Sequence, residues 1–546
     1  MISSIRLVFN FNRAFSQSAQ RMGPRLQHAS QENVAWPLPE VEKPVRWISC
    51  VVHDSIPLFH PLEHLVDSAE FQRLRRLKQV GMANYVYPSA EHSRFTHSLG
   101  CYHLAFEFVS ALRESDPSLS ITSEDMLCVS IAALCHDIGH GPFSHMFDNE
   151  LLKEKNPKST WTHEMGSGKL IGRLFSKKSI REAFLPFLGS GAHFERNIQF
   201  IKELIHPTQK VDKKGKWILE GRDSNKSYLY DIVSNEEDGH DVDKYDYLLR
   251  DALLCHVDIT FGQASLRRLR SNMRVLMDEK KGYRRIAYAK KVHNNLQSVG
   301  DSRQLMHRVV YQHYTCRAIE RMVIRALLLA DEHLTFTGSD GKRFKLSETI
   351  NDMSAFLKTD DAVIQMIENH PSTSAEMVEA RQILEKIHLR DIPKLVESED
   401  FSPQQTPRIW IAEESIELHS ESFKWVIRSA LEEALAEELP GVKFEILLRN
   451  LNRGLDGKRH PAGEVLLFDT KKPKEQLVAC RVQPEQMAMA APRDPTIMSV
   501  AVFADPYLTK EDKAAIHQVF ARVCCDFGLR SPNTSGHSSP SIIDEY

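Results

Sequence analysis

The stretch that most constrains the fold is an apolar helix that ends in titratable residues. Residues 123–139, SEDMLCVSIAALCHDIG, begin with a Ser N-cap and two acidic residues and end at a glycine. Apolar side chains lie on nearly every side of this helix, which we therefore expect to be buried. His136 and Asp137 fall in its last turn, where burying a carboxylate costs free energy unless a cation neutralises its charge. A metal ion would remove that cost, although an isolated His-Asp pair is more often a structural hydrogen bond.

Two other stretches place similar residues beside expected helix ends. His97 lies in HSRFTHSLGCYHLAFEFV (92–109), where a helix begins, and Asp243 lies in GHDVDKYDYLL (239–249), before another helix. The three stretches thus supply His, His-Asp and Asp at separated helix ends. Imidazole and carboxylate together suit Fe, Zn or Mn.

Composition limits the class of protein. A chain of 546 residues with 42% apolar and 26% charged residues predicts a globular protein of two or three domains. A net charge of −3 provides no overall basic field for nucleic acid, and we find no apolar run long enough to span a membrane. Nine cysteines without regular spacing indicate reduced, intracellular thiols.

The pattern along the chain predicts a mainly α protein with four parts. Residues 1–44 carry arginines but no acid before Glu32, as in a disordered basic leader or a mitochondrial presequence; without import, the nucleus or cytoplasm is expected. Residues 45–335 are mostly helical, with helices expected over 60–81, 123–139, 225–254 (two) and 306–334. Residues 336–525 predict a smaller α+β lobe, with a hairpin at 335–350 and β-type runs in 440–510. Residues 526–546 are expected to be disordered.

Five motifs together resemble a known family. HSRFTHSLG, CHDIGHGPFSHMFD, WTHE, YDIVSN and DVDKYDY are similar to the HD-domain phosphohydrolases, and more narrowly to the SAM-and-HD-domain deoxynucleoside triphosphate triphosphohydrolases of vertebrates. The resemblance covers residues 45–335 and, more loosely, the rest of the chain. It implies a helical HD core followed by the smaller α+β lobe. We expect no folded SAM domain in the segment before residue 45.

The resemblance implies a metal-dependent hydrolase that converts a dNTP to a deoxynucleoside and inorganic triphosphate, with roles in dNTP catabolism and antiviral defence. The implied metal ligands are His97, His136, Asp137 and Asp243, holding Fe, Zn or Mn. The implied catalytic residues are His140, His145, Asp148 and His163, with Asp148 orienting His145 as the acid. The implied substrate-binding residues are Gln79, Arg94, Lys244, Tyr247, Asp251, Arg303, His307, Tyr311 and Gln312. Mg²⁺ would accompany the substrate phosphates.

The resemblance also implies control by nucleotides and by assembly. GTP or dGTP would activate the enzyme, and dimers would form tetramers. The implied allosteric residues are Val51, Asp67, Gln72, Arg75, Arg268 and Lys290. Several neighbouring positions depart from the family's pattern, namely Cys50, His53, Asn272, Tyr288 and Tyr314. We therefore expect weaker or different nucleotide activation with an intact hydrolase site.

Two alternatives remain open. The first is another HD-type phosphohydrolase, acting on a nucleotide monophosphate, a cyclic nucleotide or a guanosine polyphosphate. The second is a nucleic-acid-binding protein that uses basic stretches such as RRLRSNMR (267–274). Few aromatic residues interleave with these charges, so the second alternative is less favoured. No membrane partner is expected.

Overall fold

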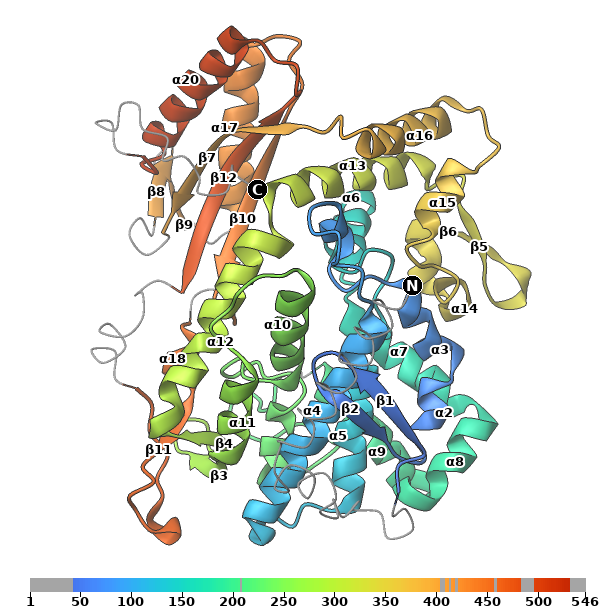
Figure 1. Ribbon diagram of the computed structural model, residues 1–546, viewed down its shortest axis with the longest axis vertical. Helices are drawn as coiled ribbons and strands as arrows, with labels where there is room; N and C mark the ends of the chain where they lie inside the picture. The colour runs from blue at the N-terminus through green and yellow to red at the C-terminus, as the bar shows by residue number, and fades with distance from the viewer. Residues whose placement is uncertain are drawn as a thin grey trace, which may run out of the picture. The chain divides into compact units, whose positions relative to one another are not determined.

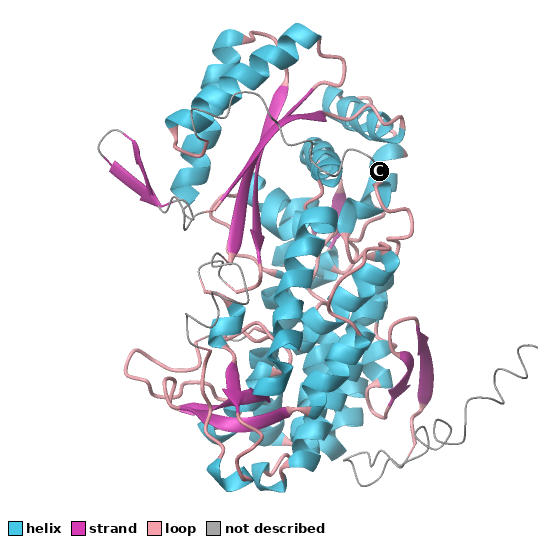
Figure 2. Ribbon diagram, turned by 60° about the vertical axis from the view of Figure 1, so that its left-hand side comes forward, coloured by secondary structure: helices cyan, strands magenta, loops and turns pink. Residues whose placement is uncertain are grey.

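The computed structural model describes residues 43–206, 209–402, 408–411, 414–417, 421–455, 459–482 and 495–530. From Val45 onward the described residues belong to one compact unit, made mostly of helices (Figure 2). The expectations for the leader before residue 43 and for the tail after residue 530 lie outside the described residues. Among those residues, no helix combines the length and the apolar character that crossing a bilayer requires.

Long helices build the first half of this unit. α4 packs against both α5 and α10, and α13 packs against α16 (Figure 1). The principal helices are α4 (Arg94–Ser115), α5 (Ser123–Cys135), α7 (His163–Ser176), α9 (Gly191–Ile205), α10 (Val242–Leu254), α12 (His293–Met306), α13 (Tyr314–Ala330) and α16 (Ala375–His388). Shorter helices connect them: α2 (Glu63–Val66), α3 (Ala69–Gln72), α6 (Leu152–Lys155), α8 (Lys178–Leu188), α11 (Gln263–Ser271), α14 (Met353–Phe356), α15 (Val363–Glu368) and α18 (Pro461–Glu464).

α5 is the buried helix that the sequence predicts. Its side chains at Leu127, Ile131 and Leu134 are fully buried. The N-cap is Thr122 rather than Ser123, because the Thr122 hydroxyl accepts from the amide of Asp125 while the Asp125 carboxylate accepts from the amide of Thr122. The helix ends at Cys135, so His136 and Asp137 follow directly at its C-terminal end.

Two of the predicted long helices are interrupted. The expected helix over 60–81 consists of α2, α3 and a 3₁₀ turn at Arg73–Arg76. The expected helix over 306–334 is split by a π-turn at His307–Tyr311, which α13 follows. Of the two helices expected over 225–254, the first is a 3₁₀ segment, Ser224–Asp231, and the second is α10.

Small sheets complete the fold. β1 (Arg46–Cys50) and β2 (Asp54–Leu58) form a hairpin, as do β5 (Thr335–Thr337) with β6 (Arg343–Lys345), and β8 (Arg408–Ile411) with β9 (Glu414–Glu417). An antiparallel sheet has the order β10 (Phe444–Asn452), β12 (Thr496–Ala504), β7 (Lys394–Phe401). Side chains of α17 (Glu421–Glu438) and α20 (Lys510–Asp526) share a core with this sheet (Figure 1).

The predicted lobe is connected to the helical part by a strand. β3 (Met273–Asp278) and β4 (Tyr283–Ala289) are antiparallel, and β11 (Leu466–Phe468) joins β4 in parallel. The hairpin expected after residue 335 is confirmed by β5 and β6, and the expected β-type runs are confirmed by β10, β11 and β12. β11, however, pairs with the helical part of the chain and not with the sheet of β10 and β12.

Candidate metal centre and active site

The site begins where α4 and α10 approach each other closely at Gly100. A Cβ atom at this position would lie 1.8 Å from Oδ1 of Asp246 and 2.5 Å from the Arg250 guanidinium. Only glycine therefore fits between these two helices. Their approach brings His97, on the first turn of α4, against Asp243, on the first turn of α10.

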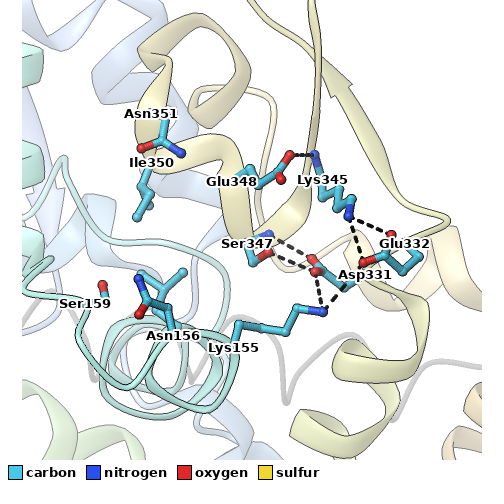
Figure 3. A pocket seen from close by; sticks show the side chains of 11 residues that line it. Lys155, Asn156, Ser159, Asp331, Glu332, Lys345, Ser347, Glu348, Ile350 and Asn351 are labelled. Carbon is cyan, nitrogen blue, oxygen red and sulfur yellow. Dashed lines mark hydrogen bonds and ion pairs between the residues drawn. The ribbon is translucent and has the colours of Figure 1, made fainter.

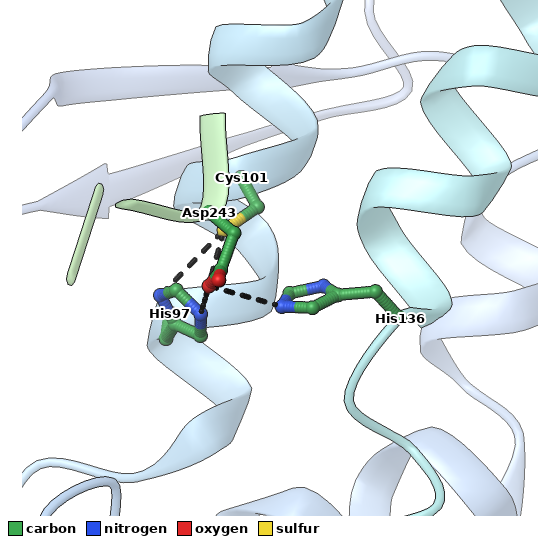
Figure 4. A group of neighbouring side chains, drawn as sticks. All are labelled: His97, Cys101, His136 and Asp243. Carbon is green, nitrogen blue, oxygen red and sulfur yellow. Dashed lines mark hydrogen bonds and ion pairs between the residues drawn. The ribbon is translucent and has the colours of Figure 1, made fainter. Parts of the chain in front are cut away.

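The four predicted metal ligands lie together. His97 Nε2 is 3.0 Å and His136 Nε2 is 3.5 Å from Oδ1 of Asp243 (Figure 4). Asp137 lies 3.7 Å from His97 Nε2 and 3.4 Å from His136 Nε2. Three separate stretches thus bring two imidazoles and the Asp243 carboxylate, together with the Cys101 thiol, within reach of one ion, and Asp137 lies beside them.

Hydrogen bonds fix which nitrogen of each imidazole faces the cluster. His97 Nδ1 lies 2.8 Å from Asp246 Oδ2, and His136 Nδ1 donates to the carbonyl of Ala133 at 2.8 Å. The Nε2 atoms of both imidazoles therefore face Asp243, and His136 Nε2 is buried without a hydrogen-bond partner. A carboxylate or carbonyl behind a ligating imidazole is the usual support of a metal site, so the residues fit a bound transition metal.

The charges agree with this assignment. Burial acts to raise the pKa of Asp137, but Arg94 and His136 overcome it and hold that pKa well below its usual value. Burial likewise opposes ionisation of Asp243, and the adjoining imidazoles of His136 and His97 lower its pKa. Both carboxylates are thus anionic at neutral pH. Cys101 lies one turn after His97, but burial raises the pKa of its thiol, which stays protonated.

The predicted catalytic residues form a second cluster beside the first. The rings of His140 and His163 stack with centroids 3.9 Å apart, and the exposed His145 lies 5.0 Å and 5.2 Å from them. His140 Nε2 is 3.3 Å from Oδ1 of Asp137, so the two clusters are in contact. The prediction that Asp148 orients His145 differs from the structure, because the hydrogen bond of Asp148, 3.1 Å long, goes to His163.

Gly139 allows the loop after α5 to reach α7. A Cβ atom here would lie 2.1 Å from the amide nitrogen of Ser167 and 2.2 Å from the carbonyl of His163. This contact places His140, on the loop, against His163, at the start of α7. Burial together with Arg94 and His163 holds the pKa of His140 well below its usual value, so that imidazole is neutral.

The predicted substrate-binding residues surround these clusters in two groups. The cationic group consists of Arg94, Lys244 and Arg303. Arg94 contacts Asp137 and Ser144. Lys244 donates to Asp241, and Arg303 donates to Asn452. In the second group the rings of Tyr247 and His307 pack on Tyr311, while the Tyr311 hydroxyl donates to Asp251 at 2.7 Å. Gln312 donates to the carbonyl of Asn450, and Oε1 of Gln79 is buried without a partner.

Four residues at the site are absent from the sequence-based prediction. His92 binds Asp251 at 2.7 Å, and Asp246 supports His97. Asp246 follows Asp243 by three residues in an expected helix, and this spacing was a usable signal. Asn452 and Asp361 come from beyond residue 335, and no local pattern points to them.

Asp361 joins two segments of the active site. Its carboxylate accepts from the amide of Lys78 at 2.8 Å and from the amide of Phe143 at 2.7 Å. Phe143 and Ser144 are both left-handed, with φ of 58° and 60°, a backbone conformation that costs about 1–3 kcal/mol per residue. The buried carboxylate thus holds the strained loop between His140 and His145 against the segment that carries Gln79.

The predicted allosteric residues lie on the surface or are already engaged. Asp67 forms an ion pair with Arg46, and Gln72 donates to the carbonyl of Val66 while accepting from Arg75. Val51 lies exposed in the turn between β1 and β2, Arg268 is exposed on α11, and Lys290 is exposed after β4. His53, which departs from the family's effector pattern, is instead buried and binds Asp246 at 2.6 Å.

A pocket of about 320 Å³ lies apart from both clusters and contains none of these residues. It is polar, and its charged side chains already pair with one another: Lys155 contacts Asp331 at 3.0 Å, and Lys345 contacts Glu332 at 2.6 Å (Figure 3). No unpaired charge in it points to a ligand, so the site is defined by the two histidine clusters.

Comparison with known proteins agrees with this geometry. The family model of the HD domain matches residues 94–210. The deoxynucleoside triphosphate triphosphohydrolase SAMHD1 of Homo sapiens is 34% identical over 499 residues, which are 90% of this chain and 76% of that protein. The proteins of the same name from Bos taurus and Mus musculus are 39% and 35% identical, over 65% and 80% of this chain and 59% and 65% of their own lengths. This chain belongs to the family of the deoxynucleoside triphosphate triphosphohydrolase SAMHD1.

Proposed function

We propose that this chain hydrolyses deoxynucleoside triphosphates to a deoxynucleoside and inorganic triphosphate and so controls dNTP pools. The observation that carries the proposal is the contact between His140 and Asp137, which places a histidine cluster directly beside a metal-binding cluster. Metal-assisted attack and proton donation need such adjacent groups. The family to which the chain belongs supports the substrate class.

The metal centre would be held by His97, His136, Asp137 and Asp243, and Fe, Zn or Mn suits these ligands. Such an ion, when bound, supplies a water of lowered pKa and polarises a phosphoryl oxygen. The protein's own part is to keep both carboxylates anionic and to hold each imidazole with its Nε2 toward the ion, as the hydrogen bonds of Asp246 and Ala133 do. Mg²⁺ would accompany the substrate phosphates.

Cationic and acidic side chains then complete the chemistry. Arg94 and Lys244 would neutralise the phosphate oxygens, because both lie beside the metal ligands. His145 is the exposed member of its cluster and would donate a proton to the departing O5′. Burial lowers the pKa of His163, but Asp148 and Glu164 raise it above its usual value. Protonated His163 and ionised Asp148 would therefore form a charged pair beside His145.

The sugar would lie against Tyr311. The Tyr311 hydroxyl donates to Asp251, and His92 also binds this carboxylate. These contacts fix the position of the Tyr311 ring. A fixed tyrosine under the sugar would leave no room for a 2′-hydroxyl, and Gln79 offers an unpaired buried oxygen to a 3′-hydroxyl. Preference for deoxynucleotides follows from this arrangement.

The product identifies the reaction. Full-length protein incubated with dGTP and divalent metal should release tripolyphosphate and deoxyguanosine in equal amounts, measured by ³¹P NMR and liquid chromatography. Asp137→Asn should abolish release, whereas Asp223→Asn, at an exposed position, should not change it. Pyrophosphate or free phosphate as the first product would indicate the other HD-type phosphohydrolase class.

Regulation by GTP or dGTP and assembly from dimers to tetramers are part of the proposal. Because Asp67 is already paired with Arg46, a guanine that binds Asp67 must displace that arginine, which supports weakened activation. Mass measurements with GTP and dATP test this; full tetramer formation at low micromolar effector would contradict it. The nucleic-acid alternative is less favoured, because few aromatic residues accompany its basic stretch and Arg270 of that stretch pairs with Glu107.

A further inference from the structure

The segment HPLEH, residues 60–64, leads from β2 into the first turn of α2 and is not used by the proposed reaction. Its two histidines and one glutamate are spaced at i, i+3 and i+4. Glu63 and His64 open α2, and the turn before this helix brings His60 Nδ1 to 2.6 Å from the Glu63 carboxylate. His60, Glu63 and His64 are therefore neighbours at the surface, and none of them belongs to the metal centre described above.

The three side chains converge on one carboxylate oxygen. His60 Nδ1 is 2.6 Å and His64 Nε2 is 3.7 Å from Oε1 of Glu63. One potential ligand atom from each residue lies within 4.8 Å of the others. A tetrahedral ion with bonds of about 2.0–2.2 Å separates its ligand atoms by roughly 3.3 Å. Small side-chain rotations would bring the cluster to that spacing.

The cluster is accessible, and among the described residues no Lys or Arg forms an ion pair with its carboxylate. The side chains of His60 and His64 are 38% and 43% exposed, while that of Glu63 is 17% exposed. Oε2 of Glu63 is buried and has no hydrogen-bond partner, which is costly for a carboxylate oxygen. The nearby Arg46 is engaged by Asp67. The His60 ring packs edge-on to Phe187, which restrains one of the two imidazoles.

We propose that His60, Glu63 and His64 form a second metal site, which binds one divalent transition-metal ion of the zinc type. Two imidazoles and a carboxylate are the ligand set that Zn²⁺, Ni²⁺ and Cu²⁺ prefer. The fourth coordination position is left to water. The site shares no ligand with the metal centre at His97, and it stands whether or not the chain hydrolyses dNTPs.

Zinc stoichiometry tests the site on the full-length protein. Isothermal titration with Zn²⁺, against a competing chelator, should give one more equivalent for the wild type than for a His60→Ala/His64→Ala variant. Glu63→Gln, which keeps the shape but removes the charge, should weaken that equivalent by about tenfold or more. With Cu²⁺ as the probe, the EPR spectrum of the extra equivalent should show nitrogen couplings from two imidazoles.

His388→Ala is the matched control. His388 is also exposed and lies 2.8 Å from a carboxylate, that of Glu368, but among the described residues no second histidine pairs with that carboxylate. Its removal should leave the zinc stoichiometry unchanged. Equal stoichiometry in the wild type and the double variant would overturn the proposal, as would an affinity that Glu63→Gln does not alter. If the double variant fails to fold, His64→Ala alone should still lose the two-nitrogen EPR signal.

Discussion

At the scale of the residue, the metal centre depends on atoms that do not face the metal. His97 can offer its Nε2 only because Asp246 holds its Nδ1. Asp246 is itself fully buried and accepts further hydrogen bonds from His53 and Arg250. A buried carboxylate with this many donors stays ionised, since burial acts to raise its pKa but Arg250, His53 and His97 hold it well below the usual value.

Asp246→Asn tests this support. The amide can accept through one oxygen only, and its NH₂ group would face one of the present donors, so His97 would lose its fixed orientation. We expect metal affinity to fall by about 10- to 100-fold, with hydrolysis restored in part by excess metal. Metal content after dialysis and activity against metal concentration measure this, with Asp223→Asn as the control. Unchanged metal affinity would show that the hydrogen bond between Asp246 and His97 does not contribute to metal binding.

At the scale of the element, helix positions were largely predictable and helix interruptions were not. The periodicity of residues 123–139 and the capping residues near its start reveal α5 because burial and capping are local properties. The π-turn at His307–Tyr311 breaks an otherwise continuous amphipathic pattern. It is stabilised by distant partners, such as Asp251 for Tyr311 and the Asn450 carbonyl for Gln312. Pairing across such sequence distances leaves no periodic signal.

The approach of α4 to α10 gives a prediction for Gly100→Ala. The added methyl group would overlap Asp246 and Arg250, so the helices must separate. We expect a loss of roughly 1–3 kcal/mol or more in the free energy of unfolding, together with weaker metal binding. Gly168→Ala in α7 is the control, since nothing lies within 4 Å of its added Cβ and alanine favours helix by up to about 1 kcal/mol. Urea denaturation distinguishes the two; similar effects of both changes would contradict the packing argument.

The segment after α14 gives a pH-dependent prediction through Asp361. Burial raises the pKa of this carboxyl to about 6, although the amides of Lys78 and Phe143 oppose the shift. The folded protein therefore keeps a proton that the unfolded chain releases near pH 4. The contribution of Asp361 to stability is full below that pH and declines as the pH rises through about 6.

Asp361→Asn removes this titration. The difference in unfolding free energy between the wild type and the variant should be largest near pH 4 and should shrink by a few kcal/mol toward pH 7, at about 1.4 kcal/mol per pKa unit. The variant should also lose kcat more than it raises KM, because the loop between His140 and His145 is no longer fixed. Parallel stability curves across this range would show that Asp361 does not titrate as stated.

At the scale of the whole molecule, the active site is divided between the helical part and the C-terminal sheets. Arg303 on α12 donates to Asn452 and Gln312 donates to Asn450, both on β10. β11 extends the sheet of β4, and Asp361 holds the loop between His140 and His145. The resemblance to HD enzymes predicted the helical part with its ligands, but it did not predict these contacts, since they depend on tertiary pairing beyond residue 335.

Shared contacts of this kind predict that the two parts unfold together. The chain has six tryptophans, among them Trp161 in the helical part and Trp425 on α17, so the difference in fluorescence between the wild type and each Trp→Phe variant reports on the part that carries the replaced residue. Urea transitions followed by fluorescence in each variant should share one midpoint with circular dichroism, as a single cooperative unit requires. A chain that ends at residue 390 lacks β10 and β11 and should lose both this cooperativity and hydrolysis. Two separated transitions in the full chain, or an active truncated chain, would mean that the helical part holds its site unaided and that Asn450 and Asn452 do not support it.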